Sequence, residues 1–98
     1  LNEFWKVKAM RAILTVIGKD TVGIIASVSH ILAKLNINIL DINQTVLQEY
    51  FTMIMLVDYK ASSVSFEQIK TELNNVGDEI GMVIRIQREE IFDSMHKL

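Results

Sequence analysis

The hydrophobic pattern in the first third of the chain changes from that of a strand to that of a helix. Residues 11–17 are apolar on both faces of an extended chain, which is typical of a strand in the interior of a sheet. Asp20 or Thr21 is a suitable N-cap for the next helix, and Asn36 is a suitable C-cap. Across residues 24–35 the apolar positions form one helical stripe: Ile24, Val28, Ile31, Leu32 and Leu35.

The next segment alternates between apolar and polar residues, but the alternation slips once. In residues 37–47 the apolar side chains fall at odd positions up to Ile39 and mostly at even positions from Leu40 onward. A slip of one residue exchanges the two faces of a strand, so we expect a bulge or a bend at these two residues. Residues 48–50 are predicted to form a hairpin turn, and residues 51–59 a second strand with two apolar faces.

The second half of the chain predicts a further helix, a strand and a short terminal helix. Ser65 and Gln68 have the spacing of a capping box, in which the serine caps the helix and the glutamine side chain reaches back. Gly77 is expected to end this helix. Residues 82–87 alternate as a half-buried strand, and residues 89–98 form a short amphipathic helix.

The order of these elements predicts an α+β fold. Two right-handed βαβ crossovers place both helices on one face of a four-stranded antiparallel sheet, so we expect the ferredoxin-like βαββαβ plait with an additional C-terminal helix over residues 89–98. Residues 1–9 carry no turn signal that ties them to the first strand, and we expect them to be an extension of a single domain over residues 10–98. The other face of the sheet keeps apolar residues, so the C-terminal helix, a partner subunit or both are expected to cover it.

Composition narrows the class of protein. Ten basic and twelve acidic residues give a net charge of −2, which argues against a nucleic-acid partner because such partners need clustered Lys and Arg. The chain has no cysteine, so disulfide and thiolate chemistry are excluded. No apolar run reaches the roughly 20 residues of a membrane span, and we expect a cytoplasmic protein. Half of the residues are apolar, which is high for so small a domain and favours a homodimer.

A turn over residues 18–23 carries the candidate chemistry. The backbone N–H groups of Val22, Gly23 and Ile24 can receive a carboxylate at the N-terminus of the helix. Asp20 can bind an ammonium group beside it, so the turn suits a molecule that carries both charges, such as an amino acid. The second glycine is not followed by the Lys-Ser or Lys-Thr pair of a phosphate loop. The alternative is that the turn binds nothing and Gly23 only lets the helix approach the sheet closely.

Asn38 opens the strand after the helix and is the second candidate binding residue. From this position it can reach the turn of its own chain or that of a neighbouring subunit, so the sequence predicts that the turn and the amide meet at one edge of the domain. The alternative is a turn residue that needs no ligand.

Catalytic and metal sites are not supported by the sequence. Ser27 and His30 are neighbours on one helix face, but no carboxylate on that face can orient the imidazole. His96 is the other histidine, and with no cysteine a zinc site is not expected. We expect neither an enzyme nor a cofactor.

The turn and the Asn-Ile pair also resemble a known family. Residues 19–25, Lys-Asp-Thr-Val-Gly-Ile-Ile, and residues 36–39, Asn-Ile-Asn-Ile, resemble the motifs of the ACT domain. From about Met10 onward the chain is similar to the small stand-alone ACT proteins that relate to the ACT modules of the glycine-cleavage repressor. The resemblance implies a homodimer with ligand sites between the subunits, built from Asp20, Thr21, Val22, Gly23 and Ile24 of one subunit with Asn38 and Ile39 of the other.

The resemblance also implies a function. ACT domains commonly bind amino acids and regulate an enzyme or a repressor. The chain departs from many ACT domains at Val22, where they have proline, and it carries no catalytic or DNA-binding domain, so the regulated protein is expected to be another chain. The alternative is a purely structural or protein-interaction dimer without a ligand.

Overall fold

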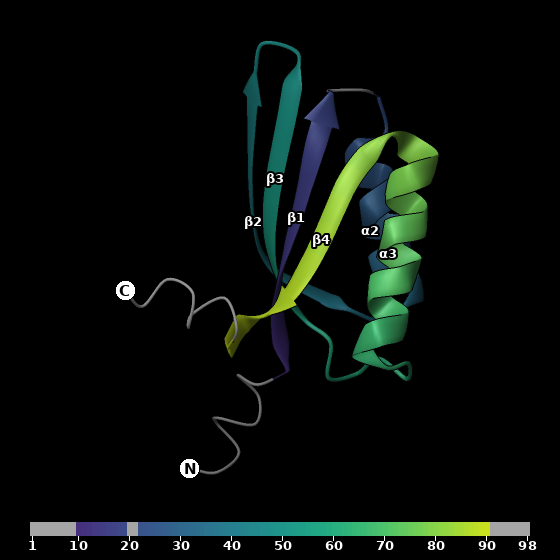
Figure 1. Ribbon diagram of the computed structural model, residues 1–98. Coiled ribbons are helices and arrows are strands. Elements are labelled where there is room, and N and C mark those ends of the chain that lie inside the picture. Colours follow the sequence, from purple (N-terminus) through teal and green to yellow (C-terminus); the bar gives the residue numbers. More distant parts are fainter. Residues whose placement is uncertain (1–9, 20–21, 91–98) are drawn as a thin grey trace.

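The fold is a four-stranded antiparallel sheet with two helices on one face (Figure 1). The structure, a computed structural model, describes residues 10–19 and 22–90. The strand order is β2-β3-β1-β4, so the predicted ferredoxin-like plait is confirmed. Its elements are β1 (Arg11–Lys19), α2 (Ile24–Lys34), β2 (Asn38–Leu47), β3 (Tyr50–Asp58), α3 (Phe66–Ile80) and β4 (Met82–Arg88). The predicted extension over residues 1–9 and the predicted helix beyond Glu90 fall outside the described residues.

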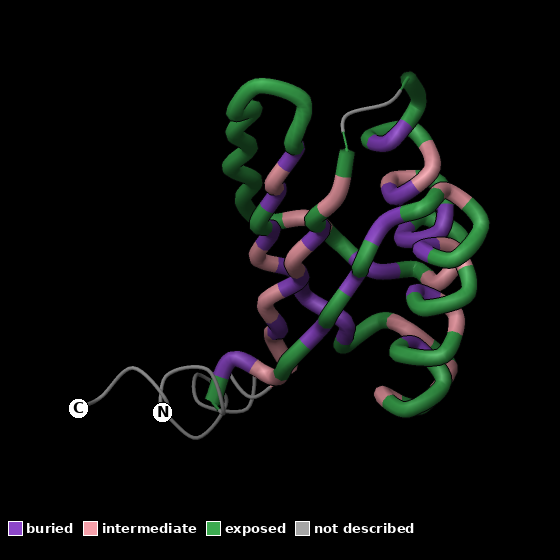
Figure 2. The backbone as a smooth tube through the Cα atoms, turned by 45° about the horizontal axis from the view of Figure 1, so that its top comes forward, coloured by how far each residue is buried: buried purple, intermediate pink, exposed green. Residues whose placement is uncertain are grey.

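The two strands with two apolar faces lie in the centre of the sheet, as predicted. β1 pairs with β3 on one side and with β4 on the other, and β2 pairs only with β3. The buried side chains of the sheet point toward the helices, where Leu14, Met53 and Met55 are fully buried. Figure 2 shows this burial concentrated between the central strands and the helices, while β2 is exposed along nearly its whole length.

The start and the end of α2 differ from the prediction. Gly23 is the N-cap, so the predicted N-cap position at Asp20 or Thr21 is wrong. Leu35 is the C-cap, and Asn36 lies one residue beyond it in the left-handed region, with φ 62°. The Asn36 side chain donates to the carbonyl oxygen of Ala61 at 3.0 Å, so it joins the helix end to a distant loop and does not cap the helix.

The start of α3 follows the prediction only in part. Ser65 accepts a hydrogen bond from the backbone N–H of Gln68, as a capping serine does. The Gln68 side chain donates to Glu72 at 3.0 Å and does not reach back, so the reciprocal half of the box is wrong.

The predicted end of α3 at Gly77 is also wrong, because the helix continues to Ile80 and Gly81 caps it with φ 73°. Gly77 is buried, and a Cβ atom there would lie 2.7 Å from the carbonyl oxygen of Met82. The glycine is therefore explained by the close approach of α3 to β4, which helix periodicity cannot reveal.

The predicted bulge in β2 is confirmed. The pairing with β3 shifts between Ile39 and Asp41, so Leu40 is the extra residue. The bulge lets Ile39 and Ile42 share the helix side of the sheet, opposite Val57 and Met55 respectively.

The face of the sheet away from the helices keeps apolar residues exposed. Ile17, Ile54 and Val83 lie on it and are each about half exposed. Nothing among the described residues covers this surface, and the predicted terminal helix is not described, so its cover stays a prediction. Within residues 10–19 and 22–90, no helix has both the length and the apolar character needed to cross a bilayer.

Candidate functional site

The turn between β1 and α2 exposes the N-terminus of the helix. Gly23 adopts φ 91°, in the left-handed region that only glycine enters without strain, and Val22 before it is fully exposed. Ile24 begins the helix and is buried at 3 % exposure, which fixes the helix end against the core. Asp20 and Thr21 lie outside the described residues.

This helix end has free hydrogen-bond donors. The first N–H groups of a helix have no partner within the helix, and a capping side chain or a ligand must satisfy them. No side chain in residues 10–19 and 22–90 caps α2, and none of its first-turn residues is acidic. The first intrahelical contact at this end is the bond from the N–H of Ser27 to the carbonyl oxygen of Gly23, at 2.9 Å. The preceding N–H groups of Ile24, Ile25 and Ala26 therefore have no partner among the described residues and lie at the positive end of the helix dipole.

Asn38 and Ile39 begin β2 and point to opposite faces of the sheet. Asn38 is exposed and pairs with Asp58, which places its side chain on the face away from the helices. Ile39 pairs with Val57, is half-buried and packs against the core. Of the two side chains, that of Asn38 is the more exposed.

The turn and Asn38 lie at opposite ends of the sheet within one chain. Asn38 is level with Asp58 and, through it, with Arg11 at the start of β1, whereas the turn follows Lys19 at the end of β1. β1 is about 27 Å long at the usual strand rise. The expectation that Asn38 could reach the turn of its own chain, and that the two meet at one edge of a single domain, is wrong. The reason is the crossover itself, because α2 carries the chain back to the other end of the sheet before β2 begins (Figure 1).

A polar cluster that the sequence did not reveal lies at the same end of the sheet as Asn38. Arg11 Nη2 and Glu89 Oε2 form an ion pair at 3.1 Å, and the Glu89 side chain is only 11 % exposed. Asp58 is buried as well and accepts a hydrogen bond from the backbone N–H of Lys60 at 2.9 Å. The ion pair joins the start of β1 to the residue after β4, and the hydrogen bond is local to the end of β3. No periodic pattern in the sequence predicts either contact.

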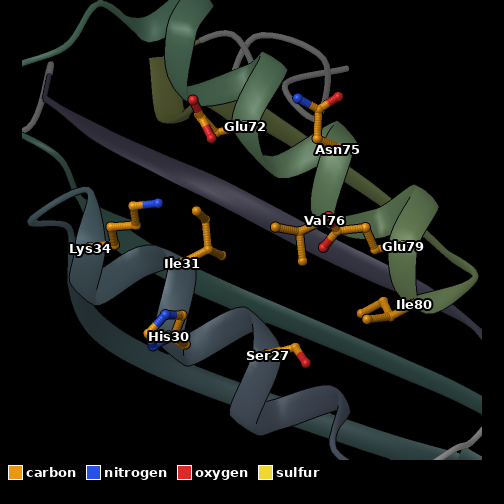
Figure 3. A pocket seen from close by; sticks show the side chains of 9 residues that line it. All are labelled: Ser27, His30, Ile31, Lys34, Glu72, Asn75, Val76, Glu79 and Ile80. Atoms are coloured by element: carbon orange, nitrogen blue, oxygen red, sulfur yellow. The ribbon is translucent and has the colours of Figure 1, made fainter.

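A groove between α2 and α3 is the second feature that sequence reasoning missed. Its volume is about 360 Å³, and residues of both helices line it (Figure 3). Ser27 and His30 lie along its α2 side, but no described residue completes a catalytic triad with them. No group of three or more His, Cys, Asp or Glu in the described part of the chain could hold a metal ion.

The fold defines a class of protein, namely small α+β plaits with a four-stranded antiparallel sheet. The family model described as ACT domain matches residues 11–87. The chain belongs to the ACT domain family, whose members are generally regulatory modules that bind small molecules.

Similar proteins cover almost the whole domain. A UPF0237 protein of Clostridium acetobutylicum is 62 % identical over 89 residues, which are 91 % of this chain and 100 % of the relative. The solved structure of an ACT domain protein from Streptococcus pneumoniae is 45 % identical, with a TM-score of 0.76 over 87 % of this chain and 96 % of the other.

A likeness to a repressor is also found at the level of the fold. A solved structure described as a candidate glycine cleavage system transcriptional repressor has a TM-score of 0.70 and 23 % identity, over 80 % of this chain and 44 % of the other. The resemblance to ACT proteins is confirmed, and the likeness to the repressor is one of fold.

Proposed function

We propose that this protein is a cytoplasmic, non-enzymatic regulatory module that binds a small amino acid between the two subunits of a homodimer and acts on another protein. The site comprises residues 20–24 of one subunit with Asn38 and Ile39 of the partner subunit. The observation that carries the proposal is the uncapped N-terminus of α2 behind Gly23.

The turn supplies the half of the site that binds a carboxylate. The N–H groups of Ile24, Ile25 and Ala26 have no partner within the helix and lie at the positive end of the helix dipole, which favours a bound anion. The fully exposed Val22 leaves room beside them. Asp20 is the proposed partner of the ammonium group, because it precedes the same turn.

The exposed edge of β2 supports a dimer that completes the site. If two β2 strands pair antiparallel, the Asn38 end of one lies level with the Leu47 end of the other. Leu47 pairs with Tyr50, which in turn pairs with Lys19, the last residue of β1 before the turn. Such a dimer would bring Asn38 of the partner subunit to the end of the sheet where the turn of the first subunit lies. A carboxamide there can donate to the ligand carboxylate and accept from its ammonium group.

A thermal-unfolding screen against the twenty amino acids tests the proposal. A ligand present at a hundred times its dissociation constant adds about 2.7 kcal/mol to the free energy of unfolding, which raises the melting temperature measurably. We expect one or a few small amino acids to produce this shift, and Asn38→Ala to remove it.

Asn43→Ala is the matched control, since Asn43 is an exposed asparagine on the same strand. Sedimentation measures whether each variant is still a dimer. It therefore shows whether a lost response to the amino acid comes from the missing ligand contact or from dissociation of the dimer. If no amino acid shifts the melting temperature at millimolar concentration, or if the shift survives Asn38→Ala, the proposed site is wrong.

A dimerisation module without a ligand is the second candidate function. The observation that favours it is the exposure of Leu40, Ile42, Val46 and Leu47 on one edge strand. A stable dimer that shows no response to any amino acid would support this function in place of the first.

A further inference from the structure

The groove between α2 and α3 has walls of opposite charge. His30 and Lys34 lie on the α2 wall, and Glu72 and Glu79 lie on the α3 wall. Figure 3 shows Lys34 with Glu72 at one end of the groove, and Ser27 with Glu79 at the other. The helices run antiparallel, because each one returns the chain along its preceding strand, and β1 and β3 are themselves antiparallel.

The charged side chains on the two walls do not form ion pairs with one another across the groove. Among the described residues, no ion pair within 4.0 Å joins Lys34 to Glu72 or Glu79. Glu72 is half-buried and is held in place by the amide of Gln68 at 3.0 Å. The walls are therefore separated by space that a third group can occupy.

The floor of the groove is apolar. Ile31 is buried at 6 % exposure, and Val76 and Ile80 are half-buried against the core. The volume of about 360 Å³ is at the small end of the range for ligand pockets, which are roughly 300–1,000 Å³. The space suits a compact molecule with one aliphatic group.

We propose that this groove binds a small zwitterion with an aliphatic side chain, at a second site separate from the turn after β1. The carboxylate of the ligand faces Lys34 on α2, and its ammonium group faces Glu72 on α3, at the same end of the groove. The aliphatic part lies over Ile31 and Val76. The segregation of positive and negative charge onto different helices is what selects a dipolar ligand, since a singly charged molecule would leave one wall unpaired.

Titration of the ¹⁵N-labelled full chain with leucine, monitored through the backbone amide shifts, tests the proposal. We expect concentration-dependent shifts in α2 near Ile31 and Lys34 and in α3 near Glu72 and Val76. N-acetyl-leucine lacks the ammonium group and leucinamide lacks the carboxylate, so each is expected to bind about threefold more weakly or worse.

Lys34→Met and Glu72→Gln each remove one wall charge with little change in shape. Because exposed charge pairs contribute little individually, each substitution is expected to weaken leucine binding about threefold. Lys70→Met is the matched control, an exposed lysine of α3 outside the groove, and it is expected to leave binding unchanged.

Asn38→Ala distinguishes the groove from the site at the turn after β1. We expect this variant to lose the response to an amino acid at the turn and to keep the amide shifts in α2 and α3. The inference is overturned if leucine at tens of millimolar gives no shifts in α2 and α3, if the shifts persist equally in Lys34→Met and Glu72→Gln, or if both singly charged analogues bind as well as leucine. Any of these results would leave the groove as a surface for another protein.

Discussion

β1 and β2 are both rich in aliphatic residues, yet they have opposite environments. In β1, Ala12, Leu14 and Val16 are completely buried under the helices. In β2, every residue except Ile39 is exposed, although the strand contains Leu40, Ile42, Val46 and Leu47. The strands differ in position, because β1 has a neighbour on each side and β2 is paired only with β3.

This contrast indicates that the apolar residues of the chain serve two purposes. Those of β1 stabilise the single domain, and those of β2 are left with no partner among the described residues. A long edge strand with exposed apolar side chains is a surface for pairing with another chain. We therefore interpret β2 as the surface on which the proposed dimer forms, and substitutions in the buried and the exposed regions test that interpretation.

The largest expected effect is on the stability of the domain. Leu14→Ala removes a completely buried side chain and is expected to lower the free energy of unfolding by about 3 kcal/mol. Ile42→Ala removes a side chain that is 43 % exposed and should cost less than about 1 kcal/mol at a fixed protein concentration. Urea denaturation of both variants measures the difference, and equal losses would contradict the contrast between the strands.

The second largest loss of stability is expected at Gly77, where α3 lies against β4 on the helix side of the sheet. Gly77→Ala forces a Cβ atom to within 2.7 Å of the Met82 carbonyl oxygen, and we expect a loss of about 2 kcal/mol from overpacking.

Gly81→Ala is the control for that substitution. Its Cβ atom meets nothing within 4 Å, so the variant carries only the strain of φ 73°, about 1 kcal/mol. The same denaturation experiment compares the two variants. If Gly77→Ala lowers the free energy of unfolding no more than Gly81→Ala does, the close approach of α3 and β4 is not the reason for a glycine at position 77.

The substitution expected to change the stability of the domain least is one that should weaken the dimer. Val46→Lys places a charge on the edge strand, where lysine disfavours strand pairing. We expect it to raise the dissociation constant of the dimer about tenfold, which is about 1.4 kcal/mol. Because Val46 is 52 % exposed, the stability of the monomer should change by no more than about 0.5 kcal/mol.

Asn74→Lys is the matched control, since it adds the same charge to an exposed position on α3. Analytical ultracentrifugation at several protein concentrations measures both variants. An unchanged dissociation constant for Val46→Lys would show that β2 is not the dimer surface.

The sequence alone was enough for the features that depend on local periodicity. The two-faced apolarity of residues 11–17 and 51–59 predicted the central strands, and the slip at Ile39 and Leu40 predicted the bulge in β2. Ser65 was recognisable as a cap, because the serine and the N–H that it accepts from are only three residues apart. These features follow from neighbours along the chain, so their pattern can be read without the fold.

Tertiary packing set the features that depend on which elements meet. Gly77 reads as a helix end in the sequence, but the contact with β4 explains it. The groove between α2 and α3 arises only when two distant helices pack together. The turn and Asn38 are close in sequence, but α2 separates them to opposite ends of the sheet. The physical reason is that a helix or strand fixes the direction of its own residues, whereas their surroundings are set by packing between elements far apart in the chain.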